Sequence, residues 1–380
     1  MIDAQASRLL TKGVEEEVYA GSRDGVVAGL SPRVTKALEG FTTEPDSRNI
    51  EAVTEPHRDY AALYADIMNK RRQLREYLLT LGAYTLIPGG TLSLGDSRQF
   101  LCSDEGNPYY VWIRNAYGSN IVTTSAHINI GMEDPVQLFR ACRIMRADAG
   151  VLLALSAASP FLDGVATDFH STRWNIFPKT PARVPLFRSH DDFKHWVEKC
   201  IASGDMQNRR HLWVSVRPNG LQSPYDLNRL ELRICDHVWN PHLLLALTAL
   251  YESMLWNIME DGSLDLPGAA GLDEEGMLRL IAANEDAVAR LSLDAQVMDW
   301  RDGRKKSMRE VCRTHLDKAL ATARKLGYAA VLQPLEQVLR EGNTAQQWLA
   351  RHAGGESVQD ILRLAIVDME QGEKVAFAAR

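Results

Sequence analysis

The sequence predicts an α+β protein, in which an antiparallel sheet with several helices is followed by a helical C-terminal portion. Segments that alternate between apolar and polar residues, as strands with one buried face do, lie in the first 240 residues. Beyond a glycine-containing linker candidate at residues 261–271, nearly every segment has helical spacing. We therefore expect an α+β portion over residues 1–260 and a helical portion over residues 261–380, which packs on the first rather than forming an independent domain.

The composition is that of an ordinary globular protein and argues against several classes of function. The 380 residues carry 43 Lys and Arg against 49 Asp and Glu, a formal net charge of -6, whereas nucleic-acid-binding proteins usually carry a basic surplus. No apolar run approaches the roughly 18 residues that a membrane span needs, and the N-terminus lacks the apolar core of a signal peptide. The five cysteines form no Cys-x-x-Cys pair, which disfavours a zinc knot or a disulfide framework. We expect a cytoplasmic protein that binds neither nucleic acid nor a membrane.

Four segments alternate as strands do, and the alternation decides which residues share a face. In the first segment Glu15 and Glu17 lie on one face, whereas Glu16 lies on the other. The second and fourth segments likewise set ionisable or polar side chains opposite an aliphatic face. The four segments are residues 12–19, 121–131, 212–217 and 229–236.

Two helices are predicted within the α+β portion. Apolar residues recur three and four positions apart over residues 60–81, and Gly82 is a natural end for that helix. The basic run at residues 70–72 is expected to lie on its solvent-facing side. Residues 149–158 are typical of a buried helix that ends before Pro160.

Capping signals predict two helices in the C-terminal portion. Ser307 followed by Glu310 forms a capping-box pattern, and Gly327 is the natural end of the helix that it begins. Ser357 followed by Asp360 repeats the signal before the last apolar-periodic segment. These helices complete the expected elements.

The polar faces of three predicted strands carry chemically unusual side chains. His127 shares a face with Asn129, and Glu231 shares a face with Arg233. For any single strand, a sheet with one packed and one solvated face is explanation enough. Glu-x-Glu, His-x-Asn and Glu-x-Arg together are harder to explain in this way, because solvated faces favour Lys, Thr and Ser. Clustered carboxylates repel one another unless cations bind among them, and oxygen ligands with one imidazole suit Mg²⁺ or Mn²⁺.

The segment at residues 41–56 adds Glu44, Asp46, Arg48 and Glu51. One interpretation is a charged turn at residues 44–47 that leads into an edge strand. The other is a fourth source of metal ligands. The segment alone does not favour either interpretation.

At this point the sequence resembles a known family, the glutamate–cysteine ligases. The likeness is closest to the cyanobacterial branch, which is related to the plant-type enzymes and to bacterial carboxylate–amine ligases, and it extends from about residue 10 to residue 370. Five further stretches support it, namely YTLIPGGTLSLG at 84–95, LALSAASPFLD at 153–163, HSTRW at 170–174, RPNG at 217–220 and DWRDGR at 299–304. The motifs that carry it, in order, are GVEEE at 13–17, EPDSRNIE at 44–51, SAHINIG at 125–131 and LELR at 230–233.

The resemblance implies a glutamine-synthetase-like fold, in which a curved antiparallel sheet forms a funnel-shaped active site within residues 1–260. It implies that the γ-carboxylate of glutamate attacks the γ-phosphate of ATP, and that the α-amine of cysteine then displaces phosphate from γ-glutamyl phosphate. The product would be γ-glutamylcysteine, the first intermediate of glutathione biosynthesis. Mg²⁺ or Mn²⁺ would neutralise the phosphates, and the enzyme would be a monomer or a homodimer.

The resemblance also assigns site residues. Arg233, on the face of Glu231, is expected to steady the transferring phosphoryl group. Arg173 resembles a family arginine near phosphate or a substrate carboxylate, although a surface salt bridge explains it equally well. Arg48, Asn129 and Arg217 are candidates for binding substrate or ATP. The metal ligands correspond to Glu15, Glu17, Glu44, Glu51, His127 and Glu231.

Other functions stay open at this stage. A carboxylate–amine ligase would keep the mechanism and use a different amine. A phosphagen-type kinase would stop at phosphoryl transfer and need no second acceptor. A metal-dependent hydrolase is disfavoured, because no His-x-x-x-His pair accompanies His127. Of the other histidines only His170 is a further candidate, and Cys235 is expected to pack in the core because nothing beside it would activate a thiolate.

Overall fold

A seven-stranded antiparallel sheet forms the centre of the molecule. The computed structural model describes residues 9–263, 265–266 and 271–378. The strands follow the spatial order β2, β3, β1, β5, β9 and β8, and β4 pairs with the second half of β1. Their bounds are β1 Lys12–Ser22, β2 Phe41–Thr43, β3 Asn49–Val53, β4 Tyr84–Ile87, β5 Ala126–Gly131, β8 Val216–Asn219 and β9 Arg229–Leu232.

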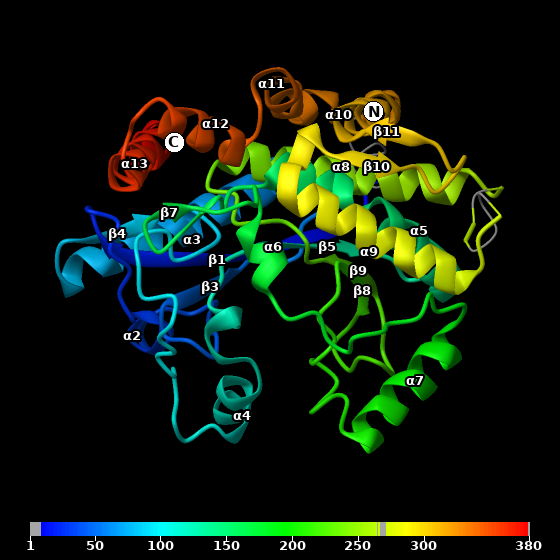
Figure 1. Cartoon of the computed structure of the whole chain (residues 1–380), viewed down its shortest axis with the longest axis horizontal. Coiled ribbons are helices and arrows are strands. Elements are labelled where there is room, and N and C mark those ends of the chain that lie inside the picture. The colour runs from blue at the N-terminus through cyan, green and yellow to red at the C-terminus, as the bar shows by residue number, and fades with distance from the viewer. Residues whose placement is uncertain (1–8, 264, 267–270, 379–380) are drawn as a thin grey trace.

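Helices cover one face of this sheet and form most of the chain beyond it. In Figure 1, α8 to α11 gather on one side of the sheet, whereas α4 and α7 lie on the other. The helices are α2 Ser31–Ala37, α3 Tyr60–Leu81, α4 Pro108–Tyr117, α5 Pro135–Ser156, α6 Thr172–Ile176, α7 His190–Ser203, α8 Pro241–Glu260, α9 Glu274–Leu291, α10 Met308–Leu326, α11 Gln333–Glu341, α12 Thr344–Ala353 and α13 Val358–Ala378.

Short elements complete the chain. Two hairpins pair β6 (Phe161–Leu162) with β7 (Val165–Ala166), and β10 (Gln296–Met298) with β11 (Lys305–Ser307). Turns of 3₁₀ helix lie at Gly118–Ile121, Ser292–Asp294 and Ala329–Leu332. Within the described part of the chain, no helix combines the length and the apolar character that crossing a membrane requires.

The core lies between the sheet and the helices, because the strands set their aliphatic face toward α5 and α8. Ile128 of β5 and Leu232 of β9 are fully buried there, opposite the apolar residues of both helices. The same core continues between α8, α9 and α10. The opposite face of β1, β5 and β9 therefore carries the polar residues, as the alternation predicts.

The predicted α+β class with C-terminal helices is confirmed, and several helix ends agree in detail. The first predicted helix spans Tyr60–Leu81, as expected. Ser307 and Glu310 form the capping box of α10, and Gly327 ends that helix in the left-handed region at φ 87°. The hydroxyl of Ser357 likewise accepts from the backbone N–H of Asp360 at the start of α13.

Other predicted boundaries are wrong. The predicted helix at 149–158 is only the end of α5, which begins at Pro135 because Asp134 caps the N–H of Val136. The strand predicted at 121–131 begins at Ala126, since the chain turns in a 3₁₀ helix up to Ile121.

The strand predicted at 229–236 leaves the ladder after Leu232. Beyond it, Ser125 and Asp236 pair only through an isolated bridge. The strand predicted at 212–217 begins four residues later, because Trp213 pairs instead with Thr180.

The segment at 41–56 forms two strands rather than one. A hairpin joins β2 to β3 through the charged turn at residues 44–47. The edge strand is β2, whereas β3 lies inside the sheet between β2 and β1. This position places Glu51 of β3 directly beside the central strand.

Candidate active site

Sheet register brings the polar residues of the central strands into one row. Glu51 of β3 lies opposite Glu17 of β1. Glu15 of β1 lies opposite His127 of β5. Directly opposite residues in an antiparallel pair project to the same face. The two carboxylates of the Glu-x-Glu motif thus lie between a third carboxylate and the imidazole.

The row continues across the other half of the sheet. Asn129 of β5 lies opposite Glu231 of β9, and Glu231 lies opposite Arg217 of β8. The amide of Asn129 donates to Glu15 Oε1 (3.1 Å) and accepts from Arg229 Nε (3.0 Å). Asn129 thereby links the carboxylate of β1 to the side chains of β9.

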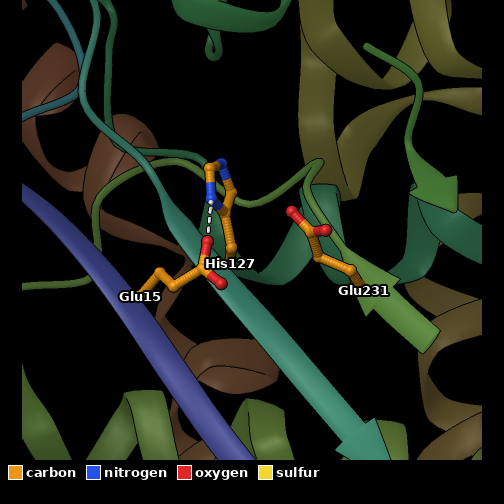
Figure 2. Close-up of side chains that lie close together, drawn as sticks. All are labelled: Glu15, His127 and Glu231. Carbon is orange, nitrogen blue, oxygen red and sulfur yellow. Dashed lines mark hydrogen bonds and ion pairs between the residues drawn. The ribbon is translucent and has the colours of Figure 1, made fainter. Parts of the chain in front are cut away.

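His127 lies at the centre of this row and is almost fully buried, with 3% of its surface exposed. Its Nδ1 lies 3.2 Å from Glu15 Oε2, and Figure 2 shows Glu15, His127 and Glu231 together on the same side of the sheet. Its Nε2 lies 2.9 Å from the hydroxyl of Ser125, which donates to Glu17 Oε2 at 2.6 Å. Carboxylates thus approach the ring from both sides.

Among the residues that the structure describes, two sets of side chains could each hold a metal ion. In each set, one ligand atom per residue lies within 4.8 Å of the others, and His127 belongs to both. Carboxylate oxygens with a single imidazole fit Mg²⁺ or Mn²⁺ better than a soft metal. The two sets are Glu15, His127 and Glu231, and Glu17, Glu51 and His127.

The electrostatics of the carboxylates also fit a cation. Burial, and after it the charge of Glu17, raises the pKa of Glu44 to about 8. Burial and the neighbouring Glu44 raise the pKa of Glu51 well above its usual range. Carboxylates with raised pKa values are short of positive charge nearby. Glu44, on the turn between β2 and β3, thus lies close to the ligand sets although it belongs to neither.

Glu231 differs from the other carboxylates because two arginines hold it. It is fully buried and accepts from Arg217 Nε at 2.7 Å, from Arg217 Nη2 at 3.1 Å and from Asn219 Nδ2 at 2.5 Å. Arg233 Nη1 pairs with it as well. Burial alone would raise the pKa of Glu231, but Arg217 and Arg233 outweigh burial and hold that pKa far below its usual range. Two guanidinium groups therefore border the carboxylate row.

Arg173 and Arg48 lie outside this row. Arg173 of α6 is buried, so a surface salt bridge is excluded, and it donates to the backbone carbonyls of Ile234 (3.1 Å) and Arg233 (3.0 Å). It holds the chain that carries Arg233. Arg48 pairs with Asp46 through two hydrogen bonds of 2.8 Å and also donates to the carbonyls of two loop residues. Its contacts fix the loop that follows β4.

The side chain of Glu16 faces the helices, as the alternation predicts. It pairs there with Arg71 of α3, whose Nε donates to Glu16 Oε2 at 3.0 Å. The expectation that residues 70–72 all face solvent is wrong for Arg71, which is only 3% exposed. A buried carboxylate needs a buried cation, and Arg71 supplies it.

Sequence reasoning missed two residues that hold the site. Ser125 bridges His127 and Glu17, and it stands two positions before His127 on the same face. Asn219 binds Glu231 and stands two positions after Arg217 on β8. Strand parity would have found both. His170 lies elsewhere, with Nδ1 2.7 Å from the hydroxyl of Ser292, and Cys235 is fully buried in the core, as expected.

Aromatic contacts join two segments on the polar side of the sheet. The hydroxyl of Tyr117, at the end of α4, lies 2.7 Å from His211 Nε2. Tyr117 and His211 both pack against Trp213, with ring centroids 5.2 and 4.8 Å apart. Tyr109, on the first turn of α4, has its pKa raised to about 12 by burial and by Glu44. Of these aromatic residues, Tyr109 therefore lies near the carboxylate of Glu44.

The sequence profile of glutamate–cysteine ligase family 2 matches residues 11–365. The chain belongs to this family. A relative from Sorangium cellulosum, which carries the provisional name glutamate–cysteine ligase 2, is 26% identical over 368 residues that cover 93% of this chain and 94% of the relative. A relative of the same provisional name from Gloeobacter violaceus is 25% identical, over 98% of this chain and 99% of its own.

Solved structures show the same fold. The bifunctional glutathione synthetase from Pasteurella multocida has a TM-score of 0.76 at 14% identity, and the match covers 99% of this chain. This chain spans about half of that protein, 54% of its length. The glutamate–cysteine ligase from Francisella tularensis, solved in complex with AMP, has a TM-score of 0.72 at 14% identity, over 98% of this chain and 93% of its own. The predicted glutamine-synthetase-like fold is thereby confirmed.

Proposed function

We propose that this member of the family is an ATP-dependent ligase that joins L-glutamate to L-cysteine. The γ-carboxylate oxygen of glutamate forms a bond to the γ-phosphorus of ATP as the bond from that phosphorus to ADP breaks. The amine nitrogen of cysteine then attacks the acyl carbon of γ-glutamyl phosphate and expels phosphate, while the amine loses a proton. The products are γ-glutamylcysteine, ADP and phosphate, and this is the first step of glutathione biosynthesis.

The observation that carries the proposal is the row of carboxylates and imidazole across the central strands. It includes Glu51, Glu17, Glu15, His127 and Glu231, which come from four different strands. ATP and glutamate are both anionic, so a face of carboxylates can accept them only together with divalent cations. Family membership over residues 11–365 supports the same reaction.

The roles of the residues follow from their positions. The two ligand sets around His127 would hold Mg²⁺ or Mn²⁺, which would supply positive charge to the phosphates during phosphoryl transfer. Arg233 would bind the oxygens of the transferring phosphoryl group from the β9 side. Arg217 would keep Glu231 ionised through its paired hydrogen bonds. Arg173 would keep Arg233 in place through the backbone.

Release of ADP from the purified protein tests the reaction and separates its rivals. With Mg²⁺ and ATP, we expect fast ADP release only when glutamate and cysteine are both present, together with a product of the mass of γ-glutamylcysteine. Equally fast release with an amine other than cysteine would instead support a carboxylate–amine ligase. Release with a single acceptor that ends phosphorylated would support a kinase, and release with ATP alone would contradict the proposal.

The metal preference gives a second expected result. The two ligand sets contain carboxylates and one imidazole and no thiolate, which predicts hard divalent cations. Turnover should therefore be supported by Mg²⁺ or Mn²⁺ and should survive a chelator that is selective for zinc. Metal analysis of the purified protein gives the independent readout. Stoichiometric zinc that turnover requires would refute this assignment.

A further inference from the structure

A network of buried and half-buried charges lies behind β1, on the side of the sheet opposite the candidate site. We call it the rear ion-pair network, and its members come from β1, α3 and the C-terminal helix α13. None of them belongs to the ligand sets around His127. The members are Glu16, Arg71, Arg75, Glu370 and Glu373.

Arg71 connects α13 to β1. Its Nε and Nη2 both pair with the carboxylate of Glu16, and its Nη1 lies 3.6 Å from Glu373 Oε1. The same Nη1 donates to the carbonyl of Trp239, and His237 Nε2 lies 3.2 Å from Glu16 Oε1. Arg71 is 3% exposed and Glu373 is 2% exposed, so this connection is shielded from water.

Arg75 of α3 makes a second connection between Glu373 and the sheet. Its Nε pairs with Glu373 Oε2, and its Nη1 donates to the hydroxyl of Thr85 at 2.8 Å. Thr85 donates to Glu370 Oε1 at 2.8 Å and lies on β4, which pairs with β1. Glu373 therefore holds two arginines, and each of them leads to the strand system around β1.

Three successive glutamates stand at this point of β1. Because side chains alternate along a strand, Glu15 and Glu17 project toward the candidate site while Glu16 projects into the rear network. The position and tilt of the strand at residue 16 set where its two neighbours point. A shift of Glu16 toward or away from α3 would move both neighbouring carboxylates with it.

From this arrangement we infer that Glu373 of α13 is a positioning residue for the metal-binding carboxylates of β1, acting through Arg71 and Glu16. The inference rests on the proposed function only in taking Glu15 and Glu17 as metal ligands. The C-terminal helix would then help to set the geometry of the metal site, although Glu373 is more than 350 positions from these ligands in the sequence. Loss of the charge at Glu373 would leave Arg71 and Arg75 to compete for the remaining carboxylates.

Mn²⁺ binding by the full chain tests the inference without relying on turnover. The EPR signal of free Mn²⁺, titrated against folded protein, gives the dissociation constant. For Glu373→Gln we expect that constant to rise roughly 2- to 30-fold, the range that mutations along a coupled network usually produce. Glu373→Asp keeps the charge and should restore most of the affinity. If Glu373→Gln yields no folded protein, Glu370→Gln at the more exposed end of the network takes its place, with the same expected direction.

Two controls separate positioning from a loss of stability. Asp148 of α5 is also a buried carboxylate that pairs with an arginine. Nη2 of Arg301, in the turn between β10 and β11, donates to its Oδ2 at 2.6 Å. Asp148→Asn should lower the melting temperature and leave Mn²⁺ affinity unchanged. Arg72→Gln, at the exposed neighbour of Arg71, should change neither.

The possible failures are distinguishable. Wild-type affinity in Glu373→Gln, or an equal loss in Asp148→Asn, would overturn the inference and leave the proposed function standing. Failure of the wild-type protein itself to bind Mn²⁺ would overturn the metal site of the proposed function and the inference with it.

Discussion

Replacing His127 with asparagine is expected to remove measurable Mn²⁺ binding and to lower kcat/KM by more than about 100-fold. His127 belongs to both sets of candidate ligands, so the replacement takes one ligand from each. Losing a residue that only supports a metal ligand costs roughly 10- to 100-fold in affinity or activity, and losing a shared ligand should cost more. ADP release and the EPR signal of free Mn²⁺ measure the two effects on one variant.

The matched control for this replacement is His195→Asn. His195 is exposed on α7, where its Nδ1 lies 2.7 Å from the carbonyl oxygen of Asp191 in the preceding turn. The His195→Asn variant should bind Mn²⁺ with the wild-type affinity and should turn over at the wild-type rate. If His127→Asn retained full Mn²⁺ affinity, the imidazole would not be a ligand. The hydrogen bonds of His127 with Ser125 and Glu15 would then be purely structural.

Strand parity was enough to predict which side chains of the sheet share a face. Glu15, Glu17, His127 and Glu231 lie on one side, and Glu16 lies on the other, because the period of two holds wherever the ladder is regular. The partner of each residue could not be predicted, since register across strands depends on contacts far apart in the sequence. The pairing of Glu51 with Glu17 is of this kind.

The predicted exposure of a side chain failed where its burial depends on a partner from another segment of the chain. Arg71 belongs to the basic run at residues 70–72, for which a solvent-facing position is predicted, yet it is buried where it pairs with the carboxylate of Glu16. A role for Arg173 near phosphate or a substrate carboxylate stays a prediction, and its hydrogen bonds to the carbonyls of Arg233 and Ile234 show that it also holds the chain there. A buried carboxylate of the wrong parity, such as Glu16, is itself a signal that a cation lies opposite.

The expected result for Arg233→Lys is a fall in kcat of roughly 10²-fold, equivalent to about 2.7 kcal/mol, the usual scale for losing one preorganised stabilising group. Glu231 already accepts two hydrogen bonds from Arg217 and one from Asn219, so it does not depend on Arg233 alone for neutralisation. The planar fork of Arg233 can therefore hold two phosphoryl oxygens at once. A lysine supplies the charge without that geometry.

Arg217→Lys provides the comparison, because the two arginines pair with the same carboxylate from neighbouring positions. If Arg233 acts on the transition state, Arg233→Lys should lower kcat while the KM values for glutamate and ATP change much less. Arg217→Lys should instead lower the melting temperature, since it breaks the paired hydrogen bonds of a fully buried carboxylate. The opposite result would be that both variants lose the same amount of melting temperature and that Arg233→Lys keeps its kcat. Both arginines would then serve only to balance the charge of Glu231.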